Sequence, residues 1–320
     1  MKKIFLYLFL IIILALTLPI VFTNEFKTEE TVAEEKFDYG EFNEIQLLHV
    51  SSGEVESLDL DTYLYGVVAS EMPANFEIEA LKAQAVVART YTIYQISNGG
   101  KHNGIADICD DPLCCQAWID KENRFARWEE AEREKNWNKI TKAVNDTKGK
   151  IIFYDGKPIN ALFHSNSGGK TELPFNVWGG DYPYFQSVET AGEENYSSYK
   201  SEVALKKEEL ISIMKEKYSD FKIDFTQDDC IKILEINENN RVTKIKLGNH
   251  EISGTEARSL FKLKSSNFVF EILGDEVEFS VTGYGHGVGL SQCGSDSLAK
   301  NGKNYEEIIK YYYKDIEISE

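Results

Sequence analysis

Positive charge is scarce in this chain of 320 residues. It holds 35 lysines and arginines against 53 aspartates and glutamates, which gives a formal net charge of −18 at pH 7. This excess of negative charge argues against a nucleic-acid partner and against docking onto anionic lipid, since both need a basic surface. Bulk charge also provides no attraction toward any other anionic polymer.

Nucleotide-binding loops are also missing. The run HSNSGGKTE at residues 164–172 ends like a phosphate loop, but that motif needs a glycine where His164 stands. The run GYGHGVGLSQCG at residues 283–294 has alternating glycines without dinucleotide spacing. Its glycines allow close backbone approach to a ligand. The small polar residues of the first run suit sugar recognition, because hydroxyls and amides bond to hydroxyl and N-acetyl groups; turn-forming filler is the alternative.

One long apolar run is present, at residues 4–22. It is long enough to cross a hydrocarbon core of about 30 Å, and the lysines before it predict a cytoplasmic tail of residues 1–3. A cleaved signal peptide is the alternative, although its apolar region would be shorter and end in small residues. Residues 23–43 are acidic and predict a flexible linker. Residues 44–320 are expected to form one large domain, with an inserted lobe at about residues 195–270.

The fold class that the patterns predict is α+β. Residues 44–58 predict a strand pair around a Ser-Ser-Gly turn. Residues 61–96 predict a short helix capped by Asp61 and a longer helix from about Ile78 with one apolar stripe. Residues 120–144 predict a charged amphipathic helix that buries Phe125, Trp128, Ile140 and Val144. A helix, a hairpin and a helix between residues 206 and 261 predict an inserted α+β lobe, so the helical segment should pack on mixed or antiparallel strands.

Glu71 lies where the two helices of residues 61–96 are predicted to part. Pro73 disfavours helical geometry at Met72, so the first helix should end near Glu71. A carboxylate at a helix C-terminus faces the negative end of the helix dipole, and burial would further raise its pKa. A raised carboxyl pKa is what a general acid needs. The alternative is a solvated glutamate at a helix end.

Three of the five cysteines lie in one short segment with His102. In a domain outside the cytoplasm, such cysteines usually form a disulfide. One histidine and two or three thiols in a short loop also make a tetrahedral nitrogen and sulfur ligand set for zinc. Both interpretations stay open on spacing alone.

Three ordered blocks resemble those of the stage II sporulation protein D family, whose relatives include bacterial amidase-enhancer proteins. They are SEMP followed by EALKAQAVVARTY, then HSNSGGKTE, then GYGHGVGLSQCG, and the likeness runs from about residue 44 to the C-terminus. The resemblance implies a membrane-tethered lytic transglycosylase, a lyase that cuts peptidoglycan during engulfment of the forespore. It also implies Zn²⁺ bound by His102, Cys109 and Cys115 as a structural metal that shapes the loop, with water or Cys114 in the fourth position.

The candidate catalytic residue is Glu71. Lys82 and Arg89 are seven residues apart and share one helix face that could flank a cleft, although solvated surface charges are the alternative for each. The remaining candidates for substrate contacts come from the two glycine-containing blocks: Ser165, Asn166, Ser167, Thr171, His286 and Gln292.

One carboxylate is enough for a lytic transglycosylase, because the C6 hydroxyl of N-acetylmuramic acid serves as an internal nucleophile and leaves a 1,6-anhydro end. Ordinary glycosidases use two carboxylates. The best second candidates are Asp107, Asp110, Asp111 and Glu172, and one of them could make the enzyme a hydrolase.

The resemblance further implies the partners and the location. The substrate would be glycan strands stripped of stem peptides, cut at the bond between N-acetylmuramic acid and N-acetylglucosamine. A partner amidase or endopeptidase and membrane proteins of the engulfment complex would act with it. The location would be the cell membrane, with a single pass and the domain outside the cytoplasm on the mother-cell side of the engulfing septum. The alternatives are a non-catalytic wall-binding enhancer of an N-acetylmuramoyl-L-alanine amidase and, more distantly, a zinc peptidase.

Overall fold

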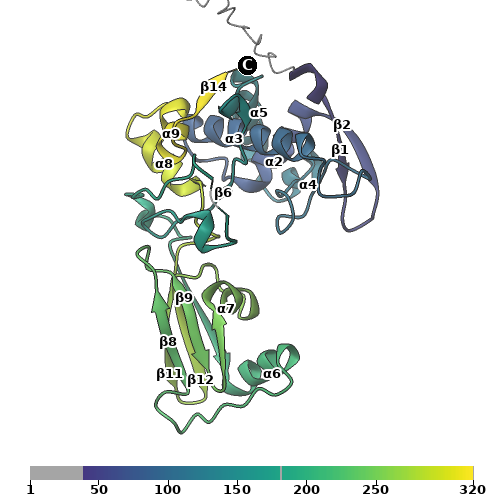
Figure 1. The fold of residues 1–320 in the computed structure, drawn as a ribbon. Coiled ribbons are helices and arrows are strands. Elements are labelled where there is room, and N and C mark those ends of the chain that lie inside the picture. The colour runs from purple at the N-terminus through teal and green to yellow at the C-terminus, as the bar shows by residue number, and fades with distance from the viewer. Residues whose placement is uncertain (1–38, 181, 320) are drawn as a thin grey trace, which may run out of the picture. The chain divides into compact units, whose positions relative to one another are not determined.

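The computed structural model describes residues 39–180 and 182–319 (Figure 1). Residues 39–320 form one compact unit. The expected cytoplasmic tail and membrane segment, and most of the expected linker, lie outside the described residues. The described part of the linker forms a 3-10 helix, η1 (Tyr39–Phe42). Among the described helices, none combines the length and the apolar character that a membrane crossing requires.

Two helices form the centre of the unit. They are α2 (Leu60–Glu71) and α3 (Ile78–Ser97), which end and begin where the sequence predicts. α3 contacts α2, α5 (Arg133–Asp146), α8 (Gln292–Lys300) and α9 (Tyr305–Tyr312), so most of its residues are buried (Figure 1). The expectation of one apolar stripe is therefore too narrow, because partners cover this helix on several sides.

The N-cap of α2 differs from the prediction. Asp59 caps the helix by accepting a hydrogen bond from the Thr62 N–H at 3.0 Å. The helix therefore begins two residues earlier than expected, and the predicted cap, Asp61, lies inside the first turn. There it forms an ion pair with Arg89. Asp59 is also a preferred capping residue, so the two aspartates compete equally on sequence alone.

Two small sheets bring distant segments of the chain to these helices. β1 (Glu44–Leu48) pairs antiparallel with β2 (Val55–Asp59), as predicted, and parallel with β3 (Ile108–Cys109). β6 (Phe163–His164) pairs parallel with β13 (Leu290–Ser291). This second pairing places the HSNSGGKTE and GYGHGVGLSQCG runs side by side.

A third sheet and several short elements complete this part of the fold. β4 (Ile151–Tyr154) pairs with β5 (Lys157–Pro158) and with β14 (Glu317–Ser319). The short 3-10 helices are η3 (Pro174–Asn176) and η4 (Glu193–Asn195).

The amphipathic helix expected at residues 120–144 is broken. The structure has α4 (Lys121–Ala126), a 3-10 turn η2 (Glu130–Glu132) and then α5. Ile140 and Val144 of α5 are buried as predicted. Phe125 and Trp128 are partly exposed instead, because the chain turns back and Phe125 packs edge-on against Trp137 of α5. Aromatic pairing of this kind stabilises the turn although neither ring is fully buried.

The lobe between η4 and the last block has its own hydrophobic core. One sheet joins β10 (His250–Ser253), β9 (Val242–Leu247) and β8 (Ile231–Ile236), and the other joins β11 (Phe268–Leu273), β12 (Glu276–Thr282) and β7 (Lys200–Lys206). Two helices, α6 (Lys207–Lys217) and α7 (Gly254–Leu260), pack on these strands (Figure 1). Its last strand ends at Thr282, beyond the expected limit near residue 270. The α+β class predicted for the domain is confirmed.

Candidate active site and metal cluster

A pocket of about 710 Å³ joins the three sequence blocks. Its volume is in the range of small-molecule sites. Its lining includes Glu71, His164, Ser165, Arg258, His286 and Gln292. The side chain of Glu71 therefore lies in a cavity shared with the serine-rich and the histidine-containing runs.

Glu71 is the last residue of α2. Met72 is extended, with φ −122° and ψ 137°, because Pro73 follows it. The Ala117 N–H donates a 2.6 Å hydrogen bond to Oε1 of Glu71. Burial raises the pKa of Glu71 to about 7, although the Ala117 N–H and the Gln292 side chain favour the charged form. The carboxyl group is thus held in one place and is protonated in part of the molecules at neutral pH.

Three of the candidate substrate contacts line the pocket. They are Ser165, His286 and Gln292. The ring of His286 lies 4.9 Å from that of Trp178, and its Nδ1 accepts a 3.1 Å hydrogen bond from the Val288 N–H. Burial lowers the pKa of His286 well below its usual value, so the ring is neutral.

The other three candidates of that block, Asn166, Ser167 and Thr171, lie behind the pocket wall. All three are buried and bonded within the protein. The structure places these three side chains in the wall of the pocket, which corrects the prediction that they contact substrate. Sequence reasoning placed them correctly on one loop but could not tell which side chains of the loop point inward.

Glu193 holds this wall together and was not foreseen. Its carboxylate accepts hydrogen bonds from the hydroxyls of Ser167 at 2.6 Å and Thr190 at 2.8 Å, from the Gly169 N–H at 3.0 Å, and from the Ser291 hydroxyl. These donors satisfy the hydrogen-bonding capacity of a carboxylate that is buried. It joins the HSNSGGKTE run to the last block. No motif in the sequence marks it.

Lys82 and Arg89 do not line the pocket, which corrects their expected place beside the cleft. Lys82 pairs with Glu79 at 2.9 Å and with Asp146 at 3.3 Å on the outer side of α3. Arg89 is fully buried, and its guanidinium binds Asp61 at 3.3 Å and the Thr147 carbonyl at 2.8 Å. Both cations connect helices.

Several further residues line the pocket. His164 is buried, and its Nδ1 lies 3.1 Å from the Val288 carbonyl oxygen, while its Nε2 has no hydrogen-bond partner among the described residues. Burial lowers the pKa of His164 to about 3. Trp178 and Tyr284, 57% and 40% exposed, add aromatic faces. His164 opens a block that the sequence analysis singled out, whereas Arg258 lies in a lobe without any sequence signal.

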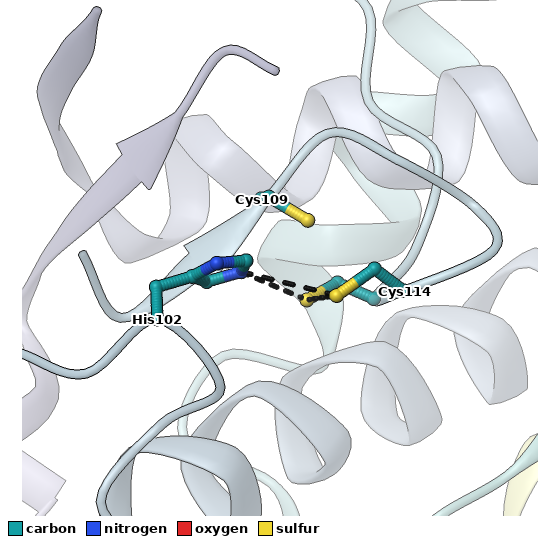
Figure 2. Close-up of side chains that lie close together, drawn as sticks. His102, Cys109 and Cys114 are labelled. Carbon is teal, nitrogen blue, oxygen red and sulfur yellow. Dashed lines mark hydrogen bonds between the residues drawn. The ribbon is translucent and has the colours of Figure 1, made fainter. Parts of the chain in front are cut away.

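The cysteine segment forms a compact donor cluster beside this pocket. His102, Cys109, Cys114 and Cys115 offer one nitrogen and three sulfur atoms, all within 4.8 Å of one another (Figure 2). Nε2 of His102 lies 3.7 Å from Sγ of Cys115 and 4.0 Å from Sγ of Cys114. All five cysteines are free thiols. This donor set fits a tetrahedral zinc site, and it includes Cys114, which the sequence left open.

The donor cluster is connected to Glu71 through the chain. Cys115 is followed by Gln116, whose Nε2 donates to the Tyr63 hydroxyl at 3.0 Å and to the Thr92 hydroxyl at 2.8 Å. Ala117 comes next and donates to Glu71. The shape of the cysteine segment therefore determines where the hydrogen-bond donor to Glu71 lies.

Sequence comparison agrees with the three blocks. A family model described as SpoIID: Stage II sporulation protein matches residues 49–154. The stage II sporulation protein D of Bacillus subtilis (strain 168) is 34% identical over 277 residues, which is 86% of this chain and 79% of that protein. The protein of the same name from Bacillus amyloliquefaciens is 31% identical over 92% of this chain and 85% of that protein. An amidase enhancer of Bacillus subtilis (strain 168) is 25% identical over 78% of this chain, but only 39% of the enhancer is covered. Blocks, pocket and relatives together show that the chain belongs to the stage II sporulation protein D family.

Proposed function

We propose that the protein is a membrane-anchored lytic transglycosylase that cuts denuded peptidoglycan strands between N-acetylmuramic acid and N-acetylglucosamine during forespore engulfment. The observation that carries this proposal is Glu71: a carboxyl group with a pKa of about 7, fixed by the Ala117 N–H, in a pocket shared by the other two blocks. A general acid works best when its pKa lies near the working pH.

The reaction needs Glu71 twice. Its protonated carboxyl gives the proton to the glycosidic oxygen as the bond from that oxygen to C1 of the muramic acid breaks. The resulting carboxylate then takes the proton of the C6 hydroxyl of the same sugar, whose oxygen bonds to C1. The product carries a 1,6-anhydro ring, and Glu71 ends protonated. Since the nucleophile belongs to the substrate, its position is already close to reactive, which lowers the barrier.

The candidate second carboxylates lie outside the pocket lining, which favours this route over hydrolysis. Asp107 accepts from the Gln46 N–H at 2.7 Å, Asp110 from the Val50 N–H at 3.0 Å, and Asp111 from the Leu113 N–H at 2.9 Å. Glu172 is buried among asparagines. Among the described residues, Glu71 is the one carboxylate in the pocket lining. A two-carboxylate mechanism therefore lacks its partner there.

A zinc ion is the second part of the proposal. His102, Cys109, Cys114 and Cys115 would hold it, since soft thiolates with one imidazole favour Zn²⁺. Bound there, zinc would supply cross-linking of the cysteine segment, because four protein ligands leave no open position for substrate or water. This closed set also argues against a zinc peptidase. This cross-link would fix the position of the Ala117 N–H beside Glu71.

The apolar residues 4–22 complete the proposal as an anchor. In this arrangement the domain lies outside the cytoplasm at the engulfing septum, on the mother-cell side, beside membrane proteins of the engulfment complex. A partner amidase or endopeptidase would prepare the strands.

The second candidate function is a non-catalytic enhancer of an N-acetylmuramoyl-L-alanine amidase. It is favoured by the similarity to one relative, the amidase enhancer of Bacillus subtilis (strain 168). In that case the pocket binds the strand and the partner cuts.

Digestion of denuded glycan strands by the purified chain separates these functions. We expect soluble products that carry a 1,6-anhydro end, one water lighter by mass spectrometry than hydrolysis products. We expect Glu71→Gln to lower turnover about 100-fold or more, because the amide cannot donate or accept the proton.

Glu77→Gln is the matched control, because Glu77 is an exposed glutamate near the same helix junction and makes no cap hydrogen bond with its side chain. It should cut at the wild-type rate. If Glu71→Gln still solubilises the strands, the catalytic assignment is wrong. If the wild type does not cut but stimulates an amidase, the enhancer function holds.

A further inference from the structure

Arg258 is a cation in the pocket that the proposed reaction does not use. It comes from α7 of the lobe, is partly buried, and lines the pocket together with Tyr284 and His286. The pocket therefore holds a positive charge as well as the Glu71 carboxyl group.

No carboxylate among the described residues forms an ion pair with Arg258. The neighbouring cation in this part of the fold, Arg241, has Glu172 at 3.9 Å. Glu193 is occupied by hydroxyl and backbone donors. Burial lowers the pKa of Arg258, and the Tyr284 side chain is the group that opposes this. A partly buried guanidinium without an anion is unfavourable, so it points to a ligand that supplies one.

The surroundings of Arg258 suit a sugar that carries a negative charge. Tyr284 is 40% exposed, and the ammonium of Lys264 lies 4.3 Å from its ring centroid. Trp178, 57% exposed, is in the same lining. Flat amphipathic rings offer contact area to a sugar ring, while two cations near Tyr284 favour an acidic substituent. This positive wall contrasts with the net charge of −18 for the whole chain.

We propose that Arg258 binds the free lactyl carboxylate of a muramic acid residue in the strand. This inference rests on the proposed function and adds the residue that recognises a stripped strand. The lactyl group is a carboxylate where the stem peptide has been removed and a neutral amide where the peptide remains. A guanidinium holds a carboxylate with two parallel charge-assisted hydrogen bonds, which an amide cannot accept. Arg258 therefore selects strands that an amidase has already processed.

Binding to the full-length Glu71→Gln variant tests this inference without turnover. The probes are an oligosaccharide of alternating N-acetylglucosamine and N-acetylmuramic acid with free carboxylates, and the same oligosaccharide after conversion of the carboxylates to methylamides. Calorimetry should show that the free acid binds at least about tenfold more tightly than the amide. Adding Arg258→Gln should reduce this ratio to about one. Arg127→Gln, which removes an exposed arginine outside the lining, should leave it unchanged.

Three outcomes separate the possibilities. A ratio that survives Arg258→Gln in a protein with a normal circular dichroism spectrum overturns the inference, even if the wild type cuts strands. A ratio that behaves as expected while the wild type fails to cut supports the carboxylate site and removes the proposed catalysis. Stronger competition by inorganic phosphate than by lactate overturns the assignment to a carboxylate and indicates a phosphate from a wall polymer.

Discussion

About half of the Glu71 carboxyl groups carry a proton at pH 7, because burial raises the pKa of Glu71 to about 7. The first step of the proposed reaction needs the protonated form. We therefore expect kcat/KM on denuded strands to be highest below pH 7 and to fall about tenfold for each pH unit well above it. A pH series with the wild-type chain measures this. A rate that stays constant from pH 6 to pH 9 would contradict the role of Glu71 as the acid.

The same pKa predicts that Glu71 destabilises the fold at high pH. The native carboxyl binds its proton more tightly than the unfolded one, whose pKa is near 4.5. Stability is therefore lost as the pH rises from about 4.5 through about 7. Glu71→Gln should be the more stable protein at pH 8, by at most about 3 kcal/mol in the free energy of unfolding, and the difference should shrink toward pH 5. Urea unfolding at both pH values checks this, and a less stable variant at pH 8 would show that burial is not the cause.

The cysteine segment acts at the scale of an element, because it places Ala117 beside Glu71. We expect Cys114→Ser to weaken zinc binding at least tenfold and to reduce the thiolate-to-cobalt absorption of the cobalt-substituted protein. Removal of zinc by a chelator should also raise the pH at which activity declines, since the Ala117 N–H lowers the pKa of Glu71.

The control for that measurement is Cys230→Ser, a buried thiol of the lobe core outside the donor cluster. It should keep the metal content and the pH profile of the wild type. Unchanged cobalt absorption in Cys114→Ser would mean that Cys114 is not a ligand and that water takes the fourth position.

Arg89 connects three elements, and its loss should be costly. It reaches Asp61 of α2 and the carbonyls of Val144 and Thr147 at the end of α5, all from the buried face of α3. Arg89→Met leaves Asp61 and these carbonyls without that donor, so we expect a loss of about 3–5 kcal/mol in the free energy of unfolding. Arg127→Met, at an exposed site, should change it by less than about 0.5 kcal/mol. Denaturant titration of both variants gives the comparison.

Element ends were predictable where a local residue determines them. Pro73 ends α2 near Glu71, and the hairpin of the lobe follows from its turn residues. The break between α4 and α5 was not predictable, because it depends on Phe125 meeting Trp137. The buried state of Arg89 was missed for the same reason: its partners lie on two other helices, and spacing within one helix does not reveal them.

At the scale of the whole molecule, the lobe is tied to the pocket wall through Glu172. This carboxylate accepts from Asn237 at 2.6 Å and Asn239 at 2.8 Å of the β8–β9 turn and lies 3.9 Å from Arg241. We expect Glu172→Ala to lower the free energy of unfolding by about 3–5 kcal/mol, since the buried Arg241 loses its ion-pair partner and the two asparagines lose their acceptor. Faster amide exchange at residues 237–241 should accompany this loss.

Glu238→Ala, an exposed change in the same turn, is the matched control and should leave stability and exchange as in the wild type. Equal behaviour of the two variants would mean that the lobe is held by other contacts.

The α+β class was predictable because helix and strand patterns are local, and so were the place of Glu71 at the end of α2 and the grouping of His102 with the cysteines. The sequence could not predict Arg258, Glu193 or the inward side of the HSNSGGKTE run. These depend on which distant segments meet, such as β6 with β13, and no residue type marks the meeting in advance.

The covering of α3 has a consequence for the order of synthesis. Its neighbours α8 and α9 are made last, and Gln292 beside Glu71 begins α8. A nascent chain that has reached only residue 282 already contains Glu71 but lacks His286 and Gln292 of the pocket lining. The pocket around Glu71 is therefore completed by the last segment of the polypeptide to be synthesised.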